Sequence, residues 1–366
     1  MRNEIKQLTG LRGVAACVVA VAHLDFMKWA FFRFIAFHNL AVDLFFCLSA
    51  FTLCLVYRPF EKDRLDMRAY GIARFARIYP LYLFALLVST FTFITWITVD
   101  FQNYDGSTTL DFVRQMLMIN ALPVVGTGTH WNLPSWSLSV EAFCYIAAFP
   151  PMFYLTRRAA DIPEWIRSSL ILVLSAGAFF MLWRHFDPTI LGWGHPSTDP
   201  LAYWTAIVRA VCSFTSGWLV YIAWKNDESL ARFTMTNTDA ITAVFLLILA
   251  GSYKGAVNQI ALLFVWPLMV VSLMSDQSWT ARFLSLRPIV WLGHLSYSIY
   301  LWHIPVYHIT MKLMPSLATS LPLRFCVQVT ATALVSTISF YLLERPSRDV
   351  IRKLLMRKPP HVATST

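Results

Sequence analysis

Long runs of apolar residues constrain the fold of this chain more than any other feature. Apolar residues make up 57% and charged residues 14% of the 366 positions, whereas a soluble domain has about half and about a quarter. Crossing a hydrocarbon core of about 30 Å takes about 20 helical residues, because lipid cannot hydrogen-bond to free backbone groups. Runs of this length predict ten transmembrane helices, near residues 10–30, 39–57, 78–99, 139–156, 168–184, 203–224, 238–252, 256–274, 288–311 and 323–343. We therefore expect an all-α, polytopic membrane bundle.

The positive charge of the chain indicates its orientation rather than a nucleic-acid partner. The net charge is +10, and most Lys and Arg residues fall in segments that alternate to one side of the predicted helices. Because positive residues accumulate on the cytoplasmic side, both termini are expected in the cytoplasm and the bilayer is the expected partner. The chain then divides into one membrane domain, residues 1–346, and a short basic and polar cytoplasmic tail, residues 347–366.

Four ionisable side chains are predicted to lie at one depth inside the membrane. Counting helical rise from the predicted boundaries puts His23, Asp43, Glu141 and His303 together in the outer half of the bilayer. Charged groups at such depth are costly and often functional. A histidine near carboxylates suits a general base, so His23, Asp43 and Glu141 are the candidate catalytic residues. The alternative is a polar network that only holds helices together.

Arginines at the inner side form a second group. Arg12 shares a helical face with His23, about 16 Å away along the axis, although an inner-rim arginine also snorkels to the headgroups. Arg74 and Arg77 are three residues apart and so face the same way, where the basic loop 58–77 meets the next helix. Two guanidinium groups there suit a phosphate-rich ligand, but the residues alone favour ordinary anchoring to anionic headgroups.

Several short segments together carry a resemblance to a known family. They are Leu8-Thr9-Gly10-Leu11-Arg12-Gly13 with His23, Val42-Asp43-Leu44-Phe45-Phe46 with Ser49, Arg74-Phe75-Ala76-Arg77-Ile78-Tyr79-Pro80, Trp136-Ser137-Leu138-Ser139-Val140-Glu141, Tyr297-Ser298-Ile299-Tyr300-Leu301-Trp302-His303 and Glu344-Arg345-Pro346. In this order they resemble the membrane acyltransferase-3 (O-acetylase) family of bacterial cell-surface acylating enzymes.

The resemblance implies transfer of acetyl from cytosolic acetyl-CoA to a hydroxyl of an exported glycan, such as exopolysaccharide, O-antigen or lipo-oligosaccharide. It implies a catalytic His23, supported by Asp43 or Glu141, and donor binding by Arg12, Arg74 and Arg77. Six further side chains of these segments are expected to face the acceptor or belong to the polar layer: Ser49, Trp136, Ser137, Tyr297, Tyr300 and His303. Acetyl-CoA is a co-substrate, and no bound cofactor or metal is expected. The implied location is the bacterial inner membrane, as a multi-pass protein.

Other functions remain open from the sequence. Direct transfer by His23 and a covalent intermediate on it are both consistent with these residues. Transfer of succinyl, or acylation of a small hydroxylated metabolite, would be a related activity, and Arg209 is the candidate cation for a succinyl group. A glycan or solute transporter with the same polar interior is a second class, and a membrane scaffold is a third. The outer loops 100–135 and 185–202 are expected to select the acceptor.

Overall fold

A computed structural model describes residues 4–23, 38–96, 109–125, 131–184, 200–254 and 256–356. Within these residues the regular elements are all helical, which confirms the predicted all-α class. The α-helices are α1 (Lys6–Ala22), α2 (His38–Tyr57), α3 (Met67–Trp96), α4 (Thr109–Met116), α5 (Ser135–Phe143), α6 (Phe149–Ala160), α7 (Glu164–Arg184), α8 (Pro200–Lys225), α9 (Ser229–Thr236), α10 (Thr238–Tyr253), α11 (Leu262–Ser272), α12 (Trp279–Leu284), α13 (Arg287–Leu313), α14 (Leu321–Ser339) and α15 (Arg345–Leu355). Two short 3-10 helices are η5 (Gln259–Ala261) and η6 (Pro315–Ala318).

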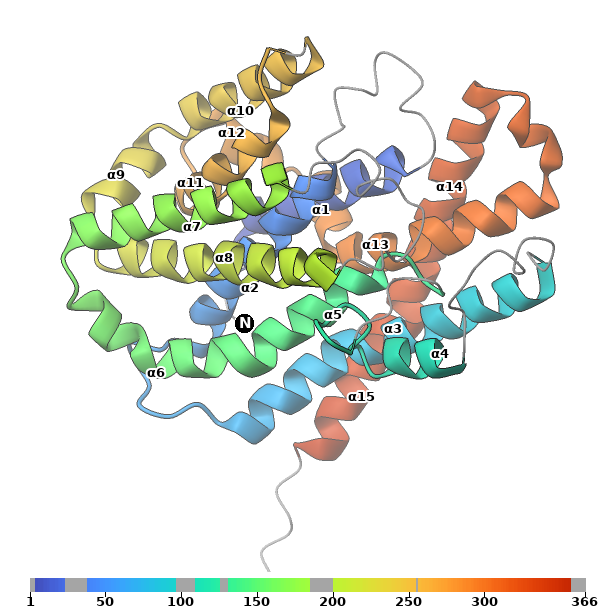
Figure 1. Cartoon of the computed structure of the whole chain (residues 1–366), viewed down its shortest axis with the longest axis horizontal. Helices are drawn as coiled ribbons and strands as arrows, with labels where there is room; N and C mark the ends of the chain where they lie inside the picture. The colour runs from blue at the N-terminus through green and yellow to red at the C-terminus, as the bar shows by residue number, and fades with distance from the viewer. Residues whose placement is uncertain are drawn as a thin grey trace, which may run out of the picture.

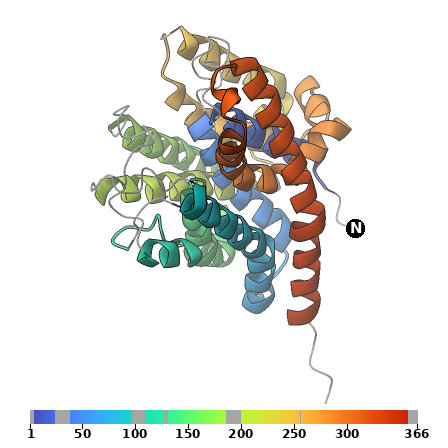
Figure 2. The same ribbon diagram turned by 90° about the vertical axis from the view of Figure 1, so that its right-hand side faces the viewer.

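Two π-helical turns join neighbouring α-helices into longer ones. Cys144–Ala148 (η4) links α5 to α6, and Phe340–Glu344 (η7) links α14 to α15. Figure 2 shows α14 and α15 as one long rod in red. A π-helical turn carries an extra residue, and such turns occur often at functional sites. Both turns here lie next to an acidic residue of a membrane helix, Glu141 and Glu344.

Six helices are long and apolar enough to cross a membrane, within the part of the chain that the structure describes. They are Leu40–Tyr57, Met67–Thr92, Ser135–Ala160, Glu164–Leu182, Trp204–Lys225 and Leu321–Leu355, and the bent pair α9–α10 would make a seventh. Each of the ten predicted runs contains a helix, but ten spans are not confirmed. The described part of α1 and the helix α11 are short, and α13 has the length but carries many Ser, Tyr and His residues. The chain is thus a multi-pass helical bundle.

Two predicted boundaries are wrong in ways that affect function. The third helix begins at Met67 rather than at 78, so Arg74 and Arg77 lie two turns inside α3 and not at its entrance. The last helix does not stop at 343 but continues through α15 to Leu355, so much of the segment predicted as a tail packs beside α3. The polar loop 100–135 contains α4, while residues 185–199 of the second outer loop lie outside the described residues.

Helices α2 and α8 occupy the middle of the bundle (Figure 1), with most of their residues buried. They approach closely because Gly217 has no side chain: a β-carbon there would lie 2.1 Å from the carbonyl oxygen of Cys47. Helices α1 and α13 pack in the same way. A β-carbon on Gly13 would lie 2.5 Å from the backbone nitrogen of Gly293, and one on Gly293 would lie 2.0 Å from the carbonyl oxygen of Thr9. Small residues allow such close backbone contact in membranes.

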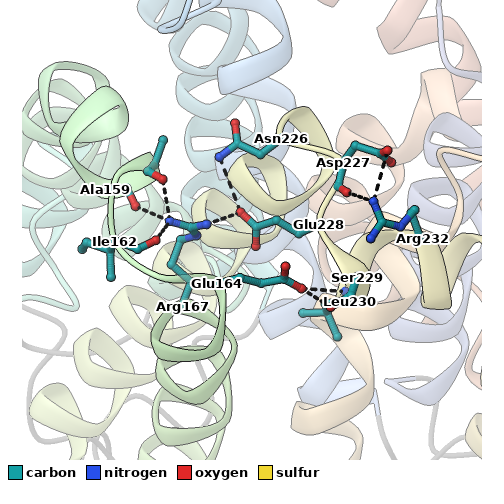
Figure 3. Close-up of polar contacts among 11 residues, drawn as sticks. Ala159, Ile162, Glu164, Arg167, Asn226, Asp227, Glu228, Ser229, Leu230 and Arg232 are labelled. Carbon is teal, nitrogen blue, oxygen red and sulfur yellow. Dashed lines mark hydrogen bonds and ion pairs between the residues drawn. The ribbon is translucent and has the colours of Figure 1, made fainter.

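A buried ion pair joins Arg167 to Glu228, as Figure 3 shows. Arg167 of α7 donates to the carbonyl oxygens of Ala159 at 2.9 Å and Ala160 at 2.8 Å, and also to that of Ile162. Its other terminal nitrogen lies 2.5 Å from Oε1 of Glu228. Carbonyl groups at the end of a helix have no partner within it, so this arginine caps α6 while it joins α7 to the start of α9.

Candidate functional site

His23 ends α1 and lies against His303 of α13. Their ring centroids are 4.9 Å apart and the ring planes are tilted by 56°, so these two histidines, which the sequence placed only at a common depth, are in contact. Nδ1 of His23 is 2.6 Å from the carbonyl oxygen of Val19. A carbonyl only accepts hydrogen bonds, so Nδ1 carries the proton and the lone pair of the neutral ring is on Nε2. The backbone of α1 therefore sets the tautomer, a task that the sequence assigned to a carboxylate.

A tyrosine connects the histidines to α5. The ring of Tyr300 lies 5.9 Å from that of His303, centroid to centroid. Its hydroxyl is 2.6 Å from Oγ of Ser137. Tyr300, Ser137 and His303 are all buried. Of the predicted polar layer, His23, His303, Tyr300 and Ser137 thus form a chain of direct contacts between α1, α13 and α5.

Asp43 is paired with an arginine that the sequence did not connect to it. Its Oδ2 is 2.5 Å from Nη2 of Arg209 and its Oδ1 accepts from Nε of the same residue at 3.2 Å. Ser213 adds a longer hydrogen bond of 3.4 Å, and the guanidinium lies 5.7 Å from the ring centroid of Trp136. Asp43 therefore joins α2 to α8, at the level of Trp136 and Ser137.

Glu141 lies deeper than the histidines, so the prediction of one common layer is wrong for this residue. Oε1 of Glu141 accepts hydrogen bonds of 2.6 Å from Oγ of Ser49 and from the hydroxyl of Tyr145. On α5 it is one turn beyond Ser137, and its partner Ser49 is six residues, about 9 Å, along α2 from Asp43. The two candidate carboxylates consequently belong to separate clusters.

The arginines gather on the far side of Glu141 from the histidines. The guanidinium of Arg74 is 5.8 Å from the ring centroid of Tyr145 and 5.9 Å from that of Tyr57. The charged and polar groups that act most strongly on Arg12 are Arg77, Tyr145, Glu141 and Glu344. Arg12, Arg74 and Arg77 therefore share one neighbourhood, although they come from two helices.

One residue of α13 and one of η7 close this neighbourhood. Tyr297 donates from its hydroxyl to the carbonyl oxygen of Ile78, at 2.6 Å, and so ties α13 to α3 between the arginine level and Pro80. Glu344, at the end of the π-helical turn η7, accepts a hydrogen bond of 2.7 Å from Ser298. Arg77, Arg348 and Arg12 are the cations that act on this carboxylate.

The site therefore has two ends with different chemistry. Imidazole and hydroxyl groups occupy one end and suit proton transfer to and from a hydroxylated compound. Guanidinium groups occupy the other end and suit phosphate oxygens. Across the described ranges, no group of three or more His, Cys, Asp or Glu side chains could hold a metal ion.

Sequence reasoning missed three contributors and one pairing. Tyr145 is four residues from Glu141, a spacing that brings helical side chains together, and this signal could have identified it. Arg348 and Arg352 show the same spacing but lie in the segment interpreted as a tail. The pairing of Arg209 with Asp43 had no local signal, because the two residues are far apart in the chain.

Known proteins resemble this chain along almost its whole length. The peptidoglycan O-acetyltransferase OatA of Listeria monocytogenes is 25% identical over 371 residues, which cover 95% of this chain and 56% of that protein. The O-acetyltransferase OatA of Staphylococcus aureus is 24% identical over 361 residues, which cover 93% of this chain and 57% of that protein. The chain thus spans about half the length of these relatives. No solved structure matches it significantly.

A family profile decides the classification. The profile described as "Acyltransferase domain" (Acyl_transf_3) matches residues 5–343, which include His23, the paired arginines of α3, Glu141 and the α13 segment with His303. The match agrees with the sequence resemblance and with the helical bundle. The chain is therefore a member of this acyltransferase family.

Proposed function

We propose that this chain is a membrane O-acyltransferase that moves an acetyl group from a CoA thioester to a hydroxyl of a cell-surface glycan. The observation that carries the proposal is the state of His23, whose Nδ1–H is held by Val19 so that its basic nitrogen is Nε2. Membership of the family supports acyl transfer. The names of the relatives support acetyl as the group and peptidoglycan, or a related glycan, as the acceptor.

His23 acts as a general base in the proposed reaction. Nε2 takes the proton of the acceptor hydroxyl while the hydroxyl oxygen attacks the carbonyl carbon of the thioester. The carbon–sulfur bond then breaks, and the departing CoA thiolate takes the proton from the imidazolium. Contact with the His303 ring, at 4.9 Å, limits the orientations that the His23 ring can adopt. Tyr300 and Ser137, beside His303, orient the acceptor through their hydroxyl groups.

The arginine end binds the phosphates of the donor. Guanidinium groups bind phosphate oxygens in pairs and remain charged in a partly buried site. Tyr57 and Tyr145 place the Arg74 guanidinium between two aromatic rings. Glu141 lies between the phosphate end and the base, so its hydrogen bonds to Ser49 and Tyr145 shape the path of the acyl group.

The ion pair of Arg209 favours acetyl over succinyl. A succinyl group carries a carboxylate, which needs an uncompensated cation near the acyl position. Arg209 was the candidate for that role, but its charge is balanced by Asp43 at 2.5 Å. Asp43 in turn stabilises the centre of the bundle rather than the imidazole.

The orientation follows from where the donor is made. CoA thioesters are cytosolic, so the arginine end faces the cytoplasm of a bacterial inner membrane, and both termini lie on that side. The excess of Lys and Arg in the loops predicted to be internal supports this orientation. Residues 109–125, which include α4, then lie on the acceptor side.

The test is release of CoA thiol from acetyl-CoA by the purified protein in detergent, with a peptidoglycan fragment as acceptor. His23→Gln should reduce the rate by at least about 100-fold, the scale of general base catalysis. His294→Gln is the control, because this histidine lies on α13, which packs against α1, but is exposed, and it should leave the rate unchanged. Normal thiol release by folded His23→Gln protein would refute the mechanism. Vesicles that take up glycan without consuming acetyl-CoA would instead identify a transporter.

A further inference from the structure

Helix α15 presents two arginines to α3. Arg348 and Arg352 are four residues apart, on one face of the helix, and both are partly buried, whereas Lys353 is exposed. Helix α15 packs beside α3, so this face meets the helix that carries Arg74 and Arg77. The two arginines lie just after Glu344, where the long rod of Figure 2 reaches its end.

The electrostatic neighbours of these arginines are mostly other arginines. Arg74 acts most strongly on Arg352, followed by Tyr57 with the opposite sign, then Arg77, and last Asp349. Arg77 and Arg352 act on Arg348, opposed by Glu344 and Asp349. Arg12 is also a neighbour of Arg77. Five guanidinium groups therefore lie near only a few carboxylates, which do not balance their positive charge. A bound anion would stabilise such a cluster.

Two of these guanidinium groups also have an unpaired nitrogen. In the part of the chain that the structure describes, Nε of Arg74 and Nε of Arg352 are buried without a hydrogen-bond partner. Buried donors nearly always have a partner, and each exception calls for an explanation. Here the two donors come from different helices and belong to residues that act on each other electrostatically. One ligand with two phosphate groups, one for each donor, would explain the two exceptions together.

We propose that Arg348 and Arg352 extend the donor site of α3 and bind the 3′-phosphate of CoA. The inference rests on the proposed function, in which the donor is a CoA thioester. Its thioester must reach His23, beyond Arg12 and Glu141, so the opposite end of the donor lies at α15. The group that distinguishes that end of CoA is the 3′-phosphate on the ribose. Arg74 and Arg77, nearer the base, then hold the pyrophosphate.

Equilibrium binding of CoA and of 3′-dephospho-CoA to the detergent-purified chain tests this assignment. The wild-type protein should bind CoA about 10- to 100-fold more tightly, the scale of one or two hydrogen bonds to a charged group. In the Arg348→Gln/Arg352→Gln variant the preference should fall below about threefold, through loss of CoA affinity alone. Lys353→Gln is the matched control from the exposed side of α15 and should keep the full preference. Arg352→Lys keeps the positive charge and should keep part of the preference for CoA.

The outcomes separate the two proposals. If the double variant retains the full preference for CoA, or the wild-type protein binds both compounds equally, the role of α15 is wrong while the proposed function stands. If the folded wild-type protein binds neither compound, the donor is not a CoA thioester and both proposals fail. Unchanged affinity of the double variant for 3′-dephospho-CoA would show that its donor site is still folded. Loss of affinity for both compounds would instead contradict a specific role of α15 in binding the 3′-phosphate.

Discussion

Asp43 of α2 and Arg209 of α8 form a buried ion pair with two hydrogen bonds. The atoms Nη2 and Oδ2 are 2.5 Å apart, and the side chains are 6% and 0% exposed. Ser213 also donates a hydrogen bond to Asp43, and the Arg209 guanidinium lies over the ring of Trp136. The pair therefore connects the two central helices to Trp136 of α5, the residue before Ser137, which bonds to Tyr300, and this position makes its role testable.

Asp43→Asn should destabilise the protein by about 3–5 kcal/mol, because Arg209 would remain charged and buried without a counter-ion. Replacing both residues, as Asp43→Leu/Arg209→Met, should restore most of this loss, since no buried charge remains. Thermal unfolding in detergent measures the stability, and thiol release measures the activity. We expect the double variant to keep activity within about tenfold of wild type. A folded double variant without activity would show that Asp43 takes part in the chemistry.

Arg167 and Glu228 form a second buried pair, whose contacts include no residue of the proposed site, and provide a comparison. Arg167→Gln should lower the melting temperature, because three carbonyl oxygens and a buried carboxylate lose their donor. The kcat of the remaining folded protein should not change. Arg232→Gln is the matched control, since its ion pair with Asp227 is exposed and contributes little. A lower kcat for folded Arg167→Gln protein would mean that this end of the bundle is coupled to the site.

Gly293 should tolerate no side chain, because its α-carbon touches α1. A β-carbon there would lie 2.0 Å from the carbonyl oxygen of Thr9, so Gly293→Ala must push α1 away from α13. Because these helices carry His23 and His303, both stability and thiol release should fall. Gly71→Ala in α3 is the control: nothing lies within 4 Å of its β-carbon, and alanine favours the helix by about 0.5–1 kcal/mol. Equal behaviour of the two variants would contradict the close packing of α1 on α13.

Apolar runs predicted the helices well but their ends poorly. Hydrophobicity reports which residues can lie in lipid, and it located a helix at each of the ten positions. It does not report how far a helix continues outside the apolar run. Met67 to Arg77 and Arg345 to Leu355 are polar enough to read as a loop and a tail, yet they pack against each other. This packing is a tertiary contact between distant segments, so neither segment alone could reveal it.

Residue type and spacing located the functional groups but not their partners. Counting helical rise placed His23 and His303 at one depth, and they meet because α1 and α13 pack closely at glycines. The same counting placed Glu141 at the level of Asp43 and was wrong, since α5 begins at Ser135, four residues before the predicted start, so Glu141 lies about a turn further along the helix. The tautomer of His23 depends on the carbonyl of Val19, and backbone groups leave no signal in the sequence.

Tyr145 contacts both ends of the site, and its hydroxyl and its ring should have separate effects on catalysis and on donor binding. Its hydroxyl donates to Glu141 at 2.6 Å, while its ring lies 5.8 Å from the Arg74 guanidinium. Tyr145→Phe removes only the hydroxyl and should lower kcat about tenfold, the effect of one hydrogen bond to a charged group. The KM for acetyl-CoA should stay nearly constant.

Tyr145→Leu removes the ring as well and should also raise the KM for acetyl-CoA, by about threefold to thirtyfold, the range of a cation–π contact. Steady-state thiol release gives both constants. Tyr154→Phe, at an exposed position on α6, is the control and should change neither. If Tyr145→Phe raised KM as much as Tyr145→Leu, the hydroxyl rather than the ring would position Arg74. The assignment of donor binding to the ring of Tyr145 and of catalysis to its hydroxyl would then be wrong.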